Sequence, residues 1–250
     1  MASDPTSQTD AADTALGSVS VLNEDLRRRM FTFIRRARRA VTRDEAAASV
    51  GISRKLAAFH LDKLVDAGLL RARYESPGGL RKVGRQPKVY EPTDTQITVT
   101  IPDRRHELLA DLLLDAVLTE GADENATQAV MRTADQRGRQ MGEAAREESR
   151  PGRLGPERGL TACERLLDRY GYEPVRESPT RLRLRNCPFH PLAAKAPDLV
   201  CGMNQAFLSG YLDGLQVNGV HAVLAPEPGE CCVRLGPSDP DREDQPTQDH

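Results

Sequence analysis

The sequence predicts an α+β protein with two structured regions joined by helical segments. Apolar residues recur at helical spacing over residues 24–67, and two strand-like runs follow. A second helical region spans residues 106–148, and residues 157–235 then alternate helix and strand patterns. The order helix, strand, strand, helix, strand, strand in this last part favours a small antiparallel sheet with helices on one face. A chain of 250 residues, 38% of them apolar, can bury one core or two modest ones.

Charge is distributed unevenly along the chain. Residues 20–92 contain seventeen Lys and Arg against eight Asp and Glu, a net +9, so the total of −2 leaves −11 for the remainder. A basic block on an otherwise acidic protein is typical of binding to phosphate backbones. No stretch approaches the roughly eighteen apolar residues of a membrane helix, and the acidic start is unlike a targeting signal. We expect a cytoplasmic protein without a membrane partner.

The N-terminal elements follow from periodicity and capping residues. Residues 1–20 lack periodicity and predict a disordered tail. Residues 24–39 predict a helix with an apolar face and arginines on its other faces. Thr42 and Glu45 form the pattern of a capping box, which predicts a short helix to Val50.

A second helix should follow after a tight turn. Gly51 tolerates the bend and Ser53 supplies the next N-cap, so residues 54–67 should be helical. Two helices joined in this way, with basic residues at the start of the second, predict a helix-turn-helix, whose second helix enters the major groove of DNA. Strand candidates at 69–74 and 88–90, with a turn between them, add a hairpin with a basic tip. The candidate DNA-binding residues in this 21–92 domain are Arg54, Lys55, Ala58, Phe59, His60, Lys63, Arg81, Lys82, Arg85 and Lys88. His60 fits a phosphate contact or a packing role.

Two runs of this domain resemble a known superfamily. V-G-I-S-R-K-L-A-A-F-H-L-D-K-L-V-D-A-G-L-L (50–70) and G-R-Q-P-K-V-Y (84–90) look like winged-helix repressors of the arsenic-repressor-like superfamily. The resemblance implies a winged helix-turn-helix that binds a palindromic operator in double-stranded DNA as a homodimer. Gln86 separates Arg85 from Pro87, whereas this group usually has Gly-Arg-Pro at the wing; we expect an altered turn with the same role.

The middle of the chain is predicted to connect and dimerise. Residues 106–118 carry too broad an apolar surface for a solvated helix, and residues 123–148 continue as an Ala-rich helix. We interpret residues 103–149 as a helical linker and dimer interface. Residues 150–155, with Pro and Gly, should be a linker.

The C-terminal domain is expected over residues 157–235, followed by an acidic, Pro-rich tail at 236–250. Thr161 to Glu164 has the pattern of a capping box opening a helix on which Cys163 faces the core. Strands are predicted at 172–175, 181–185, 220–224 and 231–235, with a helix over 199–215.

Four cysteines lie in the C-terminal region near the ends of predicted elements. Cys187 follows a strand, Cys201 begins a helix, and Cys231 and Cys232 begin another strand. Because thiols are normally reduced in the cytoplasm, such a group indicates metal ligands or redox sensors. Their spacing matches neither zinc-finger nor ferredoxin motifs, so spacing alone leaves iron–sulfur, zinc and buried structural thiols open. Adjacent strand residues face opposite sides, so Cys231 and Cys232 should not both bind one metal.

The motifs C-P-F-H, L-V-C-G-M-N and E-C-C-V-R-L beneath a winged helix resemble the iron-sulfur-binding repressors of the sulfur-mobilisation (Suf) operon. The resemblance implies a non-enzymatic repressor of cluster-assembly genes. It places a [4Fe-4S] or [2Fe-2S] cluster on Cys187, Cys201 and Cys231, with Cys232 as the alternative to Cys231. His190 is a candidate for a fourth ligand or for a cap of the following helix. Cluster binding is expected to order the C-terminal domain and to fix the spacing of the two recognition helices. Rival hypotheses are a winged-helix regulator that responds to zinc or a small ligand, and a thiol enzyme using Cys187 and His190 as nucleophile and base.

Overall fold

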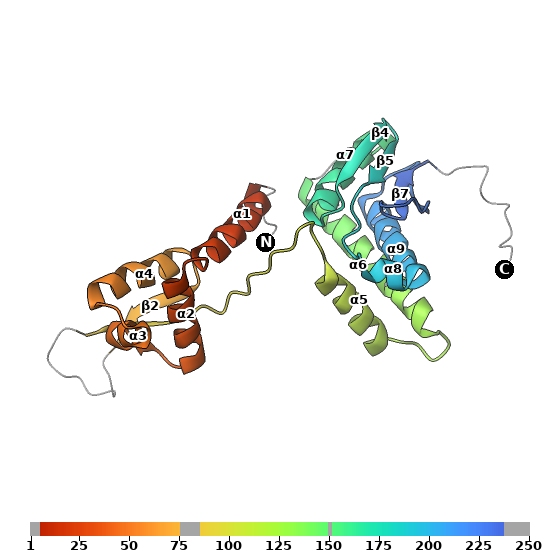
Figure 1. Ribbon diagram of the computed structural model, residues 1–250. Helices are drawn as coiled ribbons and strands as arrows, with labels where there is room; N and C mark the ends of the chain where they lie inside the picture. The colour runs from red at the N-terminus through yellow and green to blue at the C-terminus, as the bar shows by residue number, and fades with distance from the viewer. Residues whose placement is uncertain (1–5, 76–85, 150–151, 238–250) are drawn as a thin grey trace. The chain divides into compact units, whose positions relative to one another are not determined.

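The computed structural model describes residues 6–75, 86–149 and 152–237. The chain divides into two compact units, Met1–Val99 and Thr100–His250, which we call the N-terminal and C-terminal units (Figure 1). Each unit combines helices with an antiparallel sheet, so the predicted α+β class is confirmed. Within the described residues, no helix is long and apolar enough to cross a membrane.

The N-terminal unit packs helices around a three-stranded sheet of order β1-β3-β2. Its core is apolar because α2 turns Met30 and Ile34 inward and α4 contributes Leu61 and Leu64, while β3 adds the buried ring of Tyr90. In chain order the elements are α1 (Thr6–Val21), α2 (Asp25–Ala37), β1 (Val41–Thr42), α3 (Arg43–Val50), α4 (Arg54–Asp66), β2 (Leu70–Tyr74) and β3 (Lys88–Pro92).

Helix capping in this unit agrees with the sequence prediction. Thr42 Oγ1 accepts a hydrogen bond from the Glu45 amide, and the Glu45 carboxylate accepts one from the Thr42 amide, which completes the predicted capping box. Gly51 ends α3 with a φ of 72°, and the Ser53 side chain caps α4 by accepting a hydrogen bond from the Leu56 amide. The short turn between α3 and α4 is therefore set locally by residues 51–53.

The structure places a helix in the described part of residues 1–20, where the sequence predicted a disordered tail. Residues 6–21 form α1, although their apolar residues have no helical periodicity. Ser18 is buried and its hydroxyl donates hydrogen bonds to the carbonyls of Thr14, one turn earlier, and of Ala67, just after α4. This contact is long-range, so local sequence patterns did not reveal it.

The C-terminal unit places helices against a four-stranded antiparallel sheet of order β4-β5-β7-β6. The buried residues Leu182 and Leu184 of β5 and Val233 and Leu235 of β7 join the core of the unit. In chain order the elements are α5 (His106–Leu118), α6 (Ala126–Ser149), α7 (Pro156–Arg169), β4 (Pro174–Ser178), β5 (Arg181–Leu184), α8 (Leu192–Lys195), α9 (Pro197–Leu215), β6 (His221–Leu224) and β7 (Val233–Gly236).

The long helices α6 and α9 pack closely through glycines, and Figure 1 shows them side by side. A Cβ at Gly138 or Gly142 of α6 would overlap backbone atoms of α9, and one at Gly210 or Gly214 would overlap those of α6. Residues 103–149, predicted as a helical linker and dimer interface, therefore lie within the C-terminal unit, and their role as a dimer interface stays a prediction. Both α5 and α6 contribute buried residues to the same core as the sheet.

The start of α7 also differs from prediction. The helix begins at Pro156. Proline is tolerated in the first turn of a helix because the amide groups there have no partner within the helix. Thr161 lies inside the helix and its hydroxyl donates to the carbonyl of Glu157, while Glu164 accepts a hydrogen bond from Arg176 of β4. The Thr161–Glu164 pair is thus no capping box. Cys163 is buried as predicted.

Candidate functional site

The first candidate site is the outer face of α4. Its inner face buries Ala57, Leu61 and Leu64, which leaves the opposite face to solvent. The exposed face carries Arg54, Lys55, Phe59 and Lys63. Phe59 is 54% exposed and lies one helical turn from both Lys55 and Lys63, so this face combines an aromatic side chain with two cations.

Some of the predicted DNA-binding cations of this unit are paired within the protein. Arg54 Nε lies 2.5 Å from Asp44 Oδ1, and Lys88 Nζ donates to Asp62 Oδ1 at 3.0 Å. Within the described residues, Lys55 and Lys63 form no ion pair. These two lysines are the cations of α4 most available to a phosphate.

The other predicted DNA-binding residues differ in how accessible they are to DNA. His60 is buried with its Nδ1 3.5 Å from Glu24 Oε2, so it points into the unit and cannot reach DNA as placed. This favours the packing role over the phosphate contact. Ala58 is half-buried beside Phe59. Arg81, Lys82 and Arg85 of the predicted hairpin tip lie outside the described residues.

The second candidate site is a cluster of four cysteines in the C-terminal unit. Strands β5 and β7 are antiparallel neighbours, so the end of β5 meets the start of β7. The Cys231 amide donates to the Leu184 carbonyl at 2.9 Å, which extends this pairing and brings the segment after β5 beside Cys231. Cys187 lies in that segment, and Cys201 lies in the first turns of α9.

Cys187 and Cys231 form the first pair, with their thiol groups joined by a hydrogen bond. This bond lowers the pKa of Cys187 to about 7. The backbone amides of Phe189 and His190 and the charge of Arg104 also lower it, while burial opposes them. The pKa of Cys231 is raised by the same hydrogen bond and by burial.

A buried polar chain fixes Cys231. The Asn204 side-chain amide donates to Cys231 Sγ at 3.4 Å, and the Tyr172 hydroxyl donates to Asn204 Oδ1 at 2.5 Å. Sequence reasoning missed Asn204 and Tyr172. Asn204 lies three residues after Cys201, one helical turn along α9, so a polar residue at that position was a detectable signal.

Cys187 is held in place through its neighbour Asn186. The buried Asn186 side chain donates to the carbonyls of Gly171 and Asp103 and accepts from Arg104 at 2.7 Å. These bonds join three separate segments of the unit. They place the Arg104 guanidinium near the Cys187 thiol.

Cys201 and Cys232 form the second pair, a disulfide with a Cα–Cα distance of 6.3 Å. Both residues are half-buried. The adjacent residues Cys231 and Cys232, which lie just before β7, therefore contact different partners.

The predicted ligand set is not assembled in this disulfide-bonded form. Cys187 and Cys231 meet, but the Cys201 sulfur is bonded to Cys232 and cannot act as a thiolate ligand. In the described parts of the chain, no group of three or more His, Cys, Asp or Glu side chains is arranged to hold a metal ion, with or without the exposed His190. Soft thiolates suit an iron–sulfur cluster or zinc, so the donor chemistry fits but the arrangement does not.

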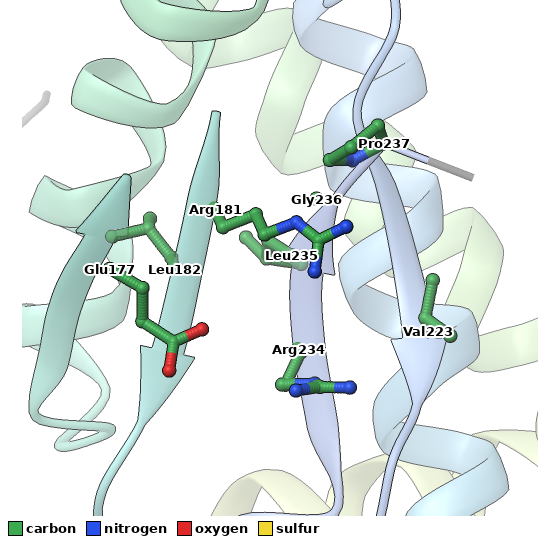
Figure 2. Close-up of a pocket in the computed structure, with 8 residues that line it drawn as sticks. All are labelled: Glu177, Arg181, Leu182, Val223, Arg234, Leu235, Gly236 and Pro237. Atoms are coloured by element: carbon green, nitrogen blue, oxygen red, sulfur yellow. The ribbon is translucent and has the colours of Figure 1, made fainter. Parts of the chain in front are cut away.

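Two further surface features lie in the C-terminal unit. Figure 2 shows a depression at the end of the C-terminal sheet, where Arg181 lies across Leu235 and Gly236. Its volume of about 20 Å³ holds roughly one water molecule. A larger cavity of about 160 Å³ lies between α5, α6 and the start of α9, and it is lined by Leu113, Ala116, Val117, Glu120, Ala126, Thr127, Val130 and Leu199.

Comparison of the chain with protein-family models, with curated proteins and with solved structures finds no match. We therefore infer the function from the geometry of these two sites and from the sequence motifs.

Proposed function

We propose that this protein is a transcription regulator, a repressor that binds double-stranded DNA through a winged helix-turn-helix. The observation that carries the proposal is the exposed basic face of α4, which follows a short turn after α3. Placed in a major groove, this face would direct Lys55 and Lys63 toward the DNA backbone and Phe59 toward base edges, where an aromatic ring can contact a thymine methyl group.

The proposed hairpin wing is supported by the pairing of β2 and β3. Arg71 and Arg73 on β2 both form ion pairs with Glu91 of β3, so their charges stabilise the hairpin and are less available to DNA. We propose that Arg81, Lys82 and Arg85, predicted to lie at the hairpin tip, contact the phosphate backbone of the DNA.

A homodimer is part of the proposal because an operator with two half-sites requires two reading helices. The support is an apolar surface on α5, where Leu114, Val117 and Leu118 are all more than half exposed. Val117 also lines the cavity between α5 and α6. A second copy that covers this surface would bury side chains that otherwise face water.

We propose that the C-terminal cysteines make DNA binding responsive to iron–sulfur status or redox stress. The support is that cysteines from three segments of the chain lie close together. Cys187 contacts Cys231. Cys201 lies three residues before Asn204, whose side chain donates a hydrogen bond to Cys231. In the reduced protein, an iron–sulfur cluster on Cys187, Cys201 and Cys231 would supply a centre that oxidation or iron starvation removes; zinc is the alternative. Genes for cluster assembly are the proposed targets.

The DNA half is tested by selecting bound fragments from a genomic library and measuring affinity by fluorescence anisotropy over a range of salt concentrations. Lys55→Ala and Lys63→Ala should each weaken binding and reduce the salt slope by about one, because each removes a phosphate contact. Lys195→Ala, an exposed lysine on α8 in the C-terminal unit, is the matched control and should change neither value. Equal effects for the three variants, or the absence of any selected fragment, would contradict the proposal.

The sensor half is tested by iron and acid-labile sulfide analysis of protein purified anaerobically under reducing conditions. The proposal expects both elements to be bound and both to be lost in Cys187→Ser. Iron-free, sulfide-free protein after attempted reconstitution would refute this half and leave the DNA half standing.

A further inference from the structure

The Cys201–Cys232 disulfide is a feature that neither DNA reading nor metal binding requires. It joins α9 to the segment that enters β7, across a sequence separation of 31 residues. Its Cα–Cα distance of 6.3 Å lies in the usual range for disulfides, so the bond needs no movement of the backbone. In a reducing compartment, such bonds are mostly transient and serve redox chemistry.

We propose that Cys201 and Cys232 form a reversible dithiol–disulfide site whose oxidant is a hydroperoxide. Cys232 is then the partner that removes Cys201 from the proposed ligand set. The existence of the redox site stands on its own, whereas this effect on ligands rests on the proposed function.

Pairing and exposure together explain why these two thiols react with each other, because Cys187 is also half-buried but lies beside the buried Cys231. Cys201 and Cys232 are half-buried and reachable from solvent, whereas Cys231 is 2% exposed and is held by Cys187 and Asn204. Cys163 is buried in the core with a pKa raised to about 12 by burial. The adjacent cysteines 231 and 232 therefore have separate roles, one fixed inside the unit and one facing Cys201.

The chemistry balances with one hydroperoxide per disulfide. The thiolate of one cysteine attacks the O–O bond, which gives a sulfenic acid on that cysteine and releases an alcohol, or water when the oxidant is hydrogen peroxide. The second thiol then attacks the sulfenic sulfur, the S–S bond forms and water leaves. Two electrons pass from the two sulfurs to the peroxide oxygens. A dithiol reductant reverses the step by thiol–disulfide exchange and becomes oxidised itself.

The oxidised site and a three-thiolate site exclude each other, because a sulfur in a disulfide has no thiolate to donate. The protein would thus respond to a peroxide even without a metal, through a covalent bond between α9 and the start of β7.

The bond can be mapped in the full-length protein. Protein stripped of metal by a chelator and freed of reductant is treated with hydrogen peroxide, and the remaining free thiols are alkylated. Tryptic cleavage after Lys195 and Arg234 leaves Cys201, Cys231 and Cys232 on one peptide, and a second cut after Glu230 separates Cys201 from the other two. Mass spectrometry should then find peptides 196–230 and 231–234 linked, and dithiothreitol should release them.

Two reciprocal variants identify the partner. Cys232→Ser should lose the link, whereas Cys231→Ser should keep it. No link in the wild-type protein, a link only between Cys187 and Cys231, or a link that survives in Cys232→Ser would overturn the inference.

Iron and sulfide analysis of the same variants separates the inference from the proposed function. Cys231→Ser should lose bound iron, and Cys232→Ser should keep it. A Cys201–Cys232 link in a protein that binds no cluster supports the redox site and refutes the cluster proposal. Cluster binding without the link supports the cluster proposal and refutes the redox site.

Discussion

The glycine contacts between α6 and α9 give the sharpest prediction, for Gly138→Ala. The new Cβ would overlap the Phe207 carbonyl oxygen and lie 2.9 Å from the Tyr211 nitrogen and 3.0 Å from the Phe207 carbonyl carbon. These are backbone atoms, so the clash is relieved only by moving the helices apart, which also loosens the contacts at Gly210 and Gly214.

The magnitude follows from two opposing terms. Overpacking a core costs about 1–3 kcal/mol, and replacing Gly by Ala inside a helix returns about 1 kcal/mol. Because the new Cβ meets backbone atoms, which cannot move aside as a side chain can, we take the upper value of the overpacking cost. We therefore expect the free energy of unfolding to fall by about 2 kcal/mol. For a unit of this size, that loss lowers Tm by roughly 4–8 °C.

Thermal unfolding followed by circular dichroism measures the effect, and Gly202→Ala is the matched control on α9. Its Cβ would meet only the end of the flexible Met131 side chain, which can move aside, so we expect a change below about 1 kcal/mol. A Gly138→Ala protein as stable as wild type would show that the helices are not packed as closely as described.

Three further predictions address other parts of the molecule. Glu45 has a folded pKa of about 2, lowered first by its hydrogen bond with Arg39 and then by those with Thr42, so its contribution to stability is complete above pH 4.5 and is lost as pH falls toward 2. The free energy of unfolding, measured as a function of pH between 4.5 and 2, should depend less on pH in Glu45→Gln than in the wild type. The same pH dependence in both proteins would contradict the capping role. Tyr172→Phe leaves buried Asn204 Oδ1 without its donor and should cost about 1–3 kcal/mol in urea unfolding, whereas exposed Tyr74→Phe, as control, should cost almost nothing. Val117→Asp should shift a homodimer to monomer in sedimentation equilibrium with little loss of stability, because Val117 is 69% exposed; Lys195→Asp should not, and dimerisation through another face would leave both variants dimeric.

Local signals in the sequence located α2, α3 and α4 of the N-terminal unit well, but not α1 or β1. The capping pair Thr42 and Glu45, the glycine at 51 and the N-cap at Ser53 act within a few residues, so their geometry follows from neighbouring side chains and backbone amides. The same local reading failed for Thr161, because the helix that contains it starts earlier at Pro156.

The cysteine site was predictable in part. From the positions of the cysteines at predicted element ends we expected several to meet, and the structure brings them together as two pairs, Cys187 with Cys231 and Cys201 with Cys232. Which sulfur meets which depends on the β5–β7 pairing and on the start of α9, and these bring together residues distant in sequence.

The sequence by itself determined the α+β class, the helix–turn–helix order, the uneven charge and the concentration of cysteines near the C-terminus, because these depend on periodicity, capping and composition. Only the tertiary structure decided that α5 and α6 share a core with the sheet, that His60 points inward, and that Cys201 pairs with Cys232 while Cys187 contacts Cys231. The physical reason is that burial and sulfur–sulfur contact are set by long-range packing, which no local pattern specifies. In the C-terminal unit this packing includes the close approach of α6 and α9 and the pairing of β5 with β7.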